Sequence, residues 1–292
     1  MVEESKGLEK VNIVEEKEVS KTLQKQVIVL SIDIEATGLS KFKDTCVEIG
    51  ITISVLDIID DTFVLNKHLE SFQGYARGRT DGNKMCDKAA EITGLSAVFI
   101  AGQKSLSLLF KNCIKHVNKV CQPFGDIERC MVAYNGTGYD IPLLCADLEC
   151  VTENGAVHFF RQLCVEKMID ILFVSRKCLD STILKRNAKG NCSFKLGDVY
   201  SALFDEKLDG AHGAIADAQA VTRLIIEHVS LNTYVAKMFK EDSICDEKEN
   251  VSMMKLVRTS VKKFNSSNDT SKDSKRSVLE MLQKSSKKRK LL

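Results

Sequence analysis

The stretch Val27–Leu39, which reads VIVLSIDIEATGL, decides the fold of this 292-residue chain. It begins with a short apolar run, which is typical of a buried strand. Side chains alternate along a strand, so Asp33 and Glu35 are expected on the same face. Neighbouring buried carboxylates repel each other and lose hydration, so a shared cation would stabilise both. Oxygen ligands on a strand suit a hard divalent ion such as Mg²⁺ or Mn²⁺, whereas a strand end that passes into a polar turn is the ordinary structural alternative.

The composition allows one substantial core, because 44% of the residues are hydrophobic. We expect no transmembrane helix, since no apolar run approaches about 18 residues. The charged start, Met1–Lys6, lacks the apolar segment of a secretory signal. The eleven cysteines form no Cys-x-x-Cys pair, which argues against a disulfide framework or a zinc site and favours a reducing intracellular compartment.

Charge and hydropathy divide the chain into three parts. Residues 1–25 are rich in Glu and Lys and are predicted to be a disordered leader. Residues 26–238 form the predicted folded domain, and residues 239–292 a basic tail that is predicted to be disordered. The tail ends in Lys284–Lys290, which reads KSSKKRK and fits a nuclear import signal, a nucleic-acid arm or a solvated end. This run favours the nucleus over the cytoplasm.

The hydrophobic periodicity predicts strands early in the chain and then strands alternating with helices. This order is typical of an α/β fold with a mixed sheet flanked by helices. Expected strands span 27–34, 47–55, 63–69, 131–134 and 168–173; expected helices span 89–96, 105–120, 141–148, 196–203 and 214–229; residues 71–87 are expected to be a loop.

Three further residues extend the opening pair of acids. Asp140 follows the turn signal Asn135-Gly136, and His212 lies in a glycine-containing loop five residues before Asp217. Each residue alone also fits an ordinary role: Asp140 an N-cap, His212 a surface residue and Asp217 a solvated helix acid. Together, four carboxylates and a histidine are what two-metal phosphodiester hydrolysis needs, because two ions clamp the attacking and leaving oxygens while the histidine takes a proton from water.

These segments resemble the three motifs of the DEDDh 3′–5′ exonucleases. The matching segments are Asp33–Leu39, Asn135–Leu144 and His212–Asp217. Within that group the chain is most similar to the three-prime repair exonuclease family, on the wording of Glu35–Leu39, Glu91–Ser96 and Tyr139–Leu144. The third motif is closer in wording to bacterial proofreading subunits. The resemblance covers about residues 27–230.

The resemblance implies a ribonuclease-H-like fold, with a five-stranded mixed sheet flanked by helices. It implies that Asp33, Glu35, Asp140 and Asp217 hold two Mg²⁺ ions, for which Mn²⁺ can substitute, and that His212 is the general base. It also implies contacts with the terminal nucleotides from Glu35, Ala36, Thr37, Leu39, Ile92, Asn135, Tyr139 and His212. Leu39 and Ile92 would pack against the terminal bases without reading sequence, and ordinary core packing is the alternative for both.

The chain departs from the family pattern at three places. Tyr134 stands where the family usually has histidine, which puts fine substrate contacts in doubt but affects no metal ligand. The proline-rich loop of some relatives is missing, since the chain has only two prolines. We also expect no C-terminal membrane anchor of the kind that some members have.

We therefore expect a Mg²⁺-dependent exonuclease that releases 5′-mononucleotides from single-stranded or frayed DNA 3′ ends in DNA repair or degradation. The alternatives are the same chemistry on RNA 3′ ends, a polymerase-associated proofreading subunit, and a nuclease-dead scaffold protein. The scaffold is disfavoured because all five motif positions are retained. The family resemblance also implies a homodimer, for which edge pairing of the second or third strand is the physical route.

Overall fold

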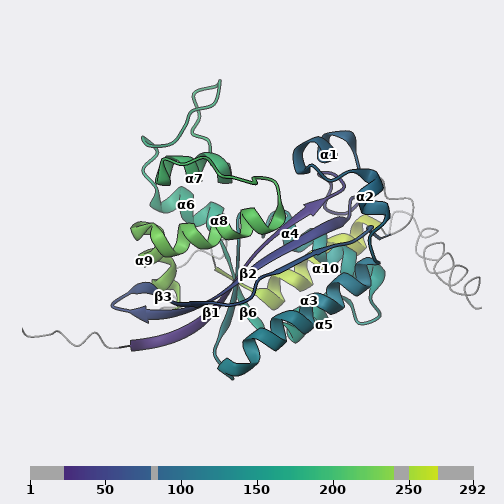
Figure 1. Ribbon diagram of the computed structural model, residues 1–292, viewed down its shortest axis with the longest axis horizontal. Coiled ribbons are helices and arrows are strands. Elements are labelled where there is room, and N and C mark those ends of the chain that lie inside the picture. Colours follow the sequence, from purple (N-terminus) through teal and green to yellow (C-terminus); the bar gives the residue numbers. More distant parts are fainter. Residues whose placement is uncertain (1–22, 80–84, 240–249, 269–292) are drawn as a thin grey trace, which may run out of the picture.

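A mixed sheet forms the centre of the computed structural model, which describes residues 23–79, 85–239 and 250–268 (Figure 1). The strand order is β3-β2-β1-β5-β6-β7, and β4 also pairs with β2. Strands β1, β5 and β6 are parallel, whereas the pairs of β2 with β1, β3 and β4 and of β7 with β6 are antiparallel. The strand bounds are β1 Leu23–Ala36, β2 Cys46–Ile59, β3 Thr62–His68, β4 Phe72–Tyr75, β5 Arg129–Ala133, β6 Val165–Asp170 and β7 Asn250–Ser252.

Helices cover both faces of this sheet (Figure 1). One layer contains α3 Leu106–Cys121, α4 Asp140–Val151, α5 Gly155–Gln162 and α10 Met253–Asn268. The other contains α6 Ile171–Cys178, α7 Leu196–Phe204, α8 Ala214–Glu227 and α9 Val229–Met238. The short helices α1 Asp87–Thr93 and α2 Ala97–Ala101 pack near the start of β2, and a 3₁₀ turn spans Gln122–Phe124. In the described part of the chain, every helix is too short or too polar to cross a bilayer.

The central strand β1 has two different faces. Ile28, Leu30, Ile32 and Ile34 point into the core shared with α3 and α4. The opposite face begins with apolar residues and continues with Ser31, Asp33 and Glu35 toward α8. The alternation thus gives β1 a full apolar face, which fixes its place in the sheet, and leaves the acids on the face covered by α8.

The predicted mixed sheet flanked by helices is confirmed, but in the part of the chain that the structure describes it contains seven strands rather than five. Strand β4 lies within residues 71–87, which were predicted to be a loop. The strand predicted at 168–173 ends at Asp170, because the Asp170 carboxylate accepts from the Leu172 amide and begins α6. The helix predicted at 214–229 is interrupted at His228, where α8 ends and α9 begins.

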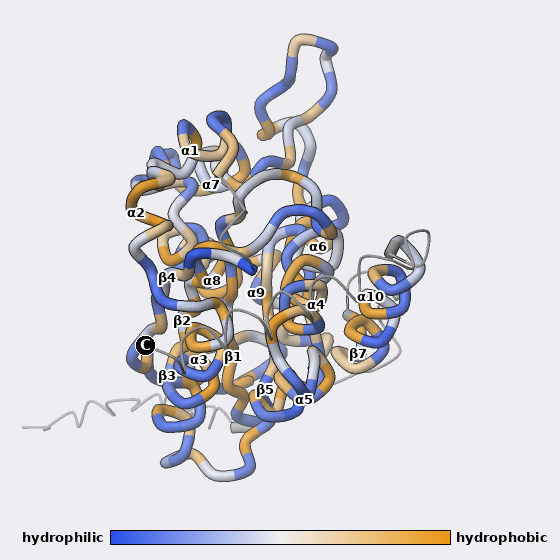
Figure 2. The backbone as a smooth tube through the Cα atoms, turned by 90° about the vertical axis from the view of Figure 1, so that its right-hand side faces the viewer, coloured by the Kyte–Doolittle hydropathy of each residue, from blue (hydrophilic) through white to orange (hydrophobic). Residues whose placement is uncertain are grey.

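The region predicted to be a disordered tail contains a strand and a helix. Residues 250–252 form β7 against β6, and residues 253–268 form α10 against α4 and α5. Met253, Val257 and Phe264 are buried, and Figure 2 shows hydrophobic and hydrophilic stretches alternating along α10. Lysines between these apolar positions lower the mean hydropathy of the segment, so its composition did not indicate the helical period. Strand β1 begins at Leu23, so residues 23–25 belong to the sheet and not to the predicted leader. Residues 1–22 and 269–292 lie outside the described residues, so the disorder predicted for them stays a prediction.

Candidate active site

Three of the predicted site acids meet at one point. Asp33 and Glu35 come from β1 and Asp217 from the first turn of α8. Each offers a carboxylate oxygen, and these oxygens all lie within 4.8 Å of one another. The group could therefore hold a metal ion between the sheet and the helix.

Asp140 lies beside this group, at the start of α4. Its side chain is only 4% exposed, and its charge raises the pKa of Asp33 and Glu35. Burial raises the pKa of Asp140 itself to about 7, although hydrogen bonds from its own amide and from that of Ile34 oppose the shift. Asp140 is not in the group whose oxygens converge within 4.8 Å, so its predicted role as a ligand stays a prediction.

The electrostatics of the group favour a bound cation. Burial, followed by the charges of Asp217 and Glu48, raises the pKa of Glu35 to about 9. Burial also raises the pKa of Asp33 and Asp217. In addition, Oδ1 of Asp217 is buried without a hydrogen-bond partner in the described residues. A divalent ion would neutralise this excess negative charge and bind Oδ1 of Asp217, so the residues present fit a metal.

His212 lies at the entrance to α8. Its backbone has φ 68°, in the left-handed region, and its amide donates to Oδ2 of Asp217 at 3.3 Å. The imidazole belongs to an exposed residue. The backbone therefore links His212 to Asp217, while the ring remains open to solvent and to a substrate.

The turn that carries Asn135 and leads to Asp140 is held by Asp170, which the sequence analysis did not identify. The fully buried carboxylate of Asp170 accepts from the amides of Asn135 at 2.9 Å and Thr137 at 3.0 Å, and from the Thr137 hydroxyl at 2.5 Å. A carboxylate at the end of an apolar strand, as in Met168–Asp170, was the available signal.

The residues predicted to contact nucleotides differ in accessibility. Leu39 is 85% exposed and Ile92 is 43% exposed, so neither is a core residue. Asn135 is exposed and Tyr139 is half-buried. Ala36 and Thr37 are buried, so only a close approach of their backbone could reach a ligand.

Tyr134, the residue that replaces the family histidine, has a structural contact. Its hydroxyl donates to the carbonyl oxygen of Phe194 at 2.8 Å. The ring packs against the core on the α8 face of the sheet. The residue is therefore anchored to the segment before α7.

A fifth acid, Glu48, was also missed. It lies on β2 directly opposite Glu35 in the antiparallel register and is 2% exposed. Its Oε1 accepts from Nε2 of Gln73 at 2.7 Å. A charged residue within the apolar run Cys46–Ile59 was the signal, because buried charges are rare without a partner.

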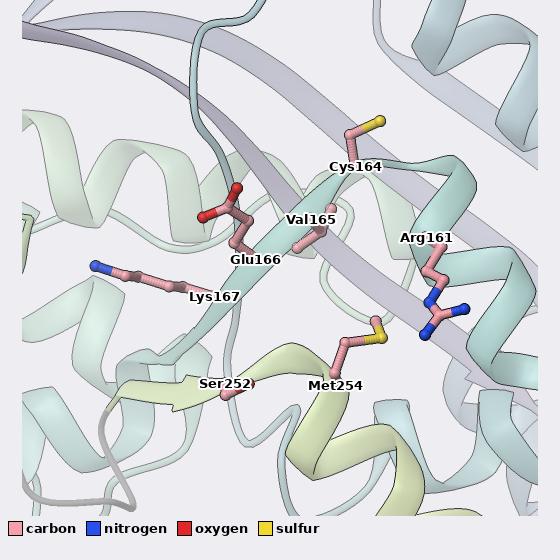
Figure 3. A pocket seen from close by; sticks show the side chains of 7 residues that line it. All are labelled: Arg161, Cys164, Val165, Glu166, Lys167, Ser252 and Met254. Atoms are coloured by element: carbon pink, nitrogen blue, oxygen red, sulfur yellow. The ribbon is translucent and has the colours of Figure 1, made fainter.

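A cavity of about 650 Å³ lies elsewhere in the fold, between the end of α5, β6, β7 and α10 (Figure 3). Its lining residues are Arg161, Cys164, Val165, Glu166, Lys167, Ser252 and Met254. It therefore contains none of the predicted site acids and is separate from the candidate active site.

Comparison with known proteins gives relatives of one kind. No protein-family model matches the chain. Three-prime repair exonuclease 1 of Bos taurus is 31% identical over 142 residues, which are 47% of this chain and 41% of that protein. Three prime repair exonuclease 2 of Homo sapiens is 24% identical over 210 residues, which are 68% of this chain and 82% of that protein. The match thus spans about two fifths of the bovine relative's length.

Solved structures give the same fold. E. coli exonuclease I in complex with a dT13 oligonucleotide has a TM-score of 0.53 at 16% identity, over 74% of this chain and 44% of that chain. The resemblance drawn from the three motifs is therefore confirmed as a similarity to the three-prime repair exonucleases.

Proposed function

We propose that this chain is a metal-dependent 3′–5′ exonuclease that acts on single-stranded or frayed DNA 3′ ends and releases 5′-mononucleotides. The observation that carries the proposal is the convergence of Asp33, Glu35 and Asp217 within 4.8 Å. The names of the sequence relatives support the activity. The oligonucleotide complex of exonuclease I supports single-stranded DNA as the substrate.

The proposed cofactor is a pair of Mg²⁺ ions, with Mn²⁺ as a substitute. Asp33, Glu35, Asp140 and Asp217 would hold them, because oxygen ligands suit hard cations. Such ions, when bound, polarise the phosphate and lower the pKa of water.

The protein's own side chains would divide the remaining tasks. His212 would accept the proton of the attacking water on its imidazole, since its ring is open to solvent. Leu39, Ile92 and Tyr139 would pack against the terminal bases. For the aromatic ring of Tyr139, base stacking is worth about 1–3 kcal/mol and tolerates any sequence. The site would thus require an unpaired 3′ end rather than a particular base.

The test is a paired digestion of 5′-labelled DNA and RNA strands with the same sequence. Each is incubated with Mg²⁺ or EDTA, with the wild-type chain, Asp217→Asn or Asp205→Asn. Asp205 is a matched control because it is exposed and has φ 53°, a conformation that asparagine tolerates. We expect a Mg²⁺-dependent 3′ ladder on DNA that only Asp217→Asn abolishes.

Other outcomes of this digestion separate the alternatives. A ladder on RNA alone would indicate that RNA, and not DNA, is the substrate. Absence of any ladder, with DNA binding retained, would indicate a scaffold protein. Copurification with a polymerase would favour the proofreading subunit.

The resemblance also supports a homodimer through the outer strand β3. Val64 and Leu65 on this strand are 45% and 37% exposed, and outer strands pair readily with other chains. Light scattering of the wild-type chain and of Val64→Lys tests this, since a charge on the pairing strand should favour the monomer.

A nuclear location is proposed from the sequence of Lys284–Lys290. A fluorescent fusion should accumulate in the nucleus. Replacing the four lysines and the arginine of this run by glutamine should redistribute it to the cytoplasm.

A further inference from the structure

We propose that Glu48 is a positioning residue of the candidate active site, which fixes the start of α8 over the acids of β1. The inference rests on the proposed function for its activity measurement. Its structural basis is the way in which α8 is attached to β1 and β2.

Helix α8 lies on a row of residues that share one face of β2. Glu48, Gly50 and Thr52 alternate along the strand and therefore point to the same side. Their partners across the register on β1 are Glu35, Asp33 and Ser31 respectively. The same two strands thus present both the site acids and the surface on which α8 rests.

The middle of this row brings the backbone of α8 unusually close. A Cβ on Gly50 would lie 2.3 Å from the carbonyl carbon of Ala214 and 2.4 Å from the amide nitrogen of Ile215. Only glycine permits this approach. The first turn of α8 therefore lies directly on β2, beside Asp33.

Hydrogen bonds attach the second half of the same helix. The Thr222 hydroxyl lies 2.5 Å from that of Thr52 and donates to the Ser31 hydroxyl at 2.8 Å. Thr222 is 5% exposed. These contacts attach α8 to the sheet at a point remote from the acids. Thr222 therefore offers a matched control for Glu48.

Glu48 supplies a carboxylate acceptor at the start of α8, where the helix has no side-chain cap of its own. The N-cap residue of α8 is Gly213, which makes no side-chain cap. Helix starts have amide groups without intrahelical partners, and a carboxylate there is favourable. Oε2 of Glu48 accepts from the Ala214 amide at 3.4 Å, while Oε1 is held by Gln73.

The position of this attachment links Glu48 to the chemistry. Ala214 lies between His212 and Asp217, which are predicted to supply the base and a metal ligand. A shift of the helix start would move both groups relative to Asp33 and Glu35. Misplacement of about 1 Å can lower a rate by about 100-fold.

Five variants test the inference: Glu48→Leu, Glu48→Gln, Thr222→Val, Gly213→Ser, and Glu48→Leu combined with Gly213→Ser. Glu48→Leu removes the acceptor and should lower kcat on the order of 100-fold with little change in KM. Glu48→Gln keeps an acceptor oxygen and should retain kcat within about 5-fold. Thr222→Val should lower Tm but leave kcat within about 3-fold, because it loosens the helix away from the acids.

The double variant examines the mechanism of positioning. A serine at position 213 can cap α8 from its own chain, since Gly213 has the extended backbone of ordinary N-caps. Its Cβ would lie 3.2 Å from the carbonyl oxygen of Gly210, so this loop must move by a few tenths of an ångström. Its hydroxyl should restore at least about 10-fold of the kcat lost in Glu48→Leu and also raise Tm, which guards against failure of the single variant to fold. Gly213→Ser alone is the control for its effect on the loop.

Two results would overturn the inference. Equal kcat losses in Glu48→Leu and Thr222→Val, at equal losses of Tm, would mean that Glu48 only stabilises the fold. A Glu48→Gln variant as inactive as Glu48→Leu, with weaker Mg²⁺ dependence, would make Glu48 a metal ligand. If the wild-type chain has no nuclease activity, the proposed function fails. The Tm gain on Mg²⁺ addition, compared across the same variants, then tests the positioning role of Glu48 separately.

Discussion

The hydroxyl of Tyr139 donates to the carbonyl oxygen of Gly38 at 2.5 Å. This bond joins the turn after Glu35 to the residue before Asp140. Lys41 reinforces it, because its ammonium group donates to the carbonyl oxygen of Gly138 at 3.0 Å. The two segments that carry predicted nucleotide contacts are thus tied together.

Tyr139→Phe removes this bond and keeps the ring. We expect a stability loss of about 1 kcal/mol and an increased KM for oligonucleotides, with kcat largely retained. Tyr134→Phe is the matched control, because it also loses one hydroxyl bond, to Phe194, but should leave KM unchanged. Melting curves measure the stability loss, and steady-state kinetics measure KM. Equal KM values for the two variants would argue against a role of the Tyr139–Gly38 hydrogen bond in substrate binding.

His212→Ala should lower kcat by about 100- to 10,000-fold, the usual contribution of a general base. The metal should still bind, because the acids remain. His158→Ala, at an exposed position of α5, is the control. Single-turnover digestion and the Mg²⁺-induced change in Tm separate the two effects; loss of that Tm change in His212→Ala would give the histidine a part in metal binding.

The metal-free protein should become less stable as pH rises. The folded-state pKa of Glu35 is raised from 4.5 to about 9, and that of Asp140 from 3.8 to about 7. The folded state therefore holds these protons more tightly than the unfolded state. The resulting stability is complete below the ordinary pKa values and is lost as pH rises through the raised ones.

Melting in EDTA from pH 5 to pH 9 measures this loss, and Glu35→Gln should flatten the curve. Mg²⁺ should raise Tm more at pH 9 than at pH 5, since it binds the ionised acids. A metal-free Tm that is constant or rises with pH would contradict the prediction.

Two truncations should separate the basic tail from α10. Removing residues 269–292 deletes the Lys/Arg run and should weaken DNA binding at low salt while kcat is retained. Removing residues 253–292 also deletes buried Met253, Val257 and Phe264, each of which contributes about 1.5–3 kcal/mol when buried. The longer deletion should therefore lower Tm strongly; binding titrations at two salt concentrations and melting curves distinguish the two.

Leu39→Ala should raise KM without lowering Tm. The side chain is 85% exposed and adds little to folding, so its apolar surface is available to a base. Val229→Ala, at a residue that is 76% exposed on α9, is the control for loss of exposed apolar area. Equal KM values for the two variants would indicate that Leu39 is not part of the substrate-binding surface.

Much of the fold could be predicted from period-two patterns. The apolar run in residues 27–34 predicts β1 and the alternation in residues 47–55 predicts β2, while the two-residue spacing of Asp33 and Glu35 places both on one face. Strand β4 was missed because it is short and contains Gly74. Helix α10 was missed because lysines lower its mean hydropathy although its apolar residues keep a helical spacing.

The site was predictable in part for a physical reason. Two acids at fixed spacing on one strand can be recognised from the sequence, as can a histidine just before a helix and an acid in the first turn of that helix. Glu48 and Asp170 act through tertiary contacts with Ala214 and with the turn at Asn135. Those contacts depend on which strands are neighbours, and local sequence does not specify that.

The docking of α8 onto β1 and β2 also affects the order of events during synthesis. The acids of β1 are made early, and Asp217 follows only after almost the whole domain. Long-range pairings of this kind form late in folding, and chains emerge from the ribosome with the N-terminal part first. A nascent chain thus carries an incomplete set of acids until α8 has emerged and reached Gly50, so the proposed metal site cannot form before that point.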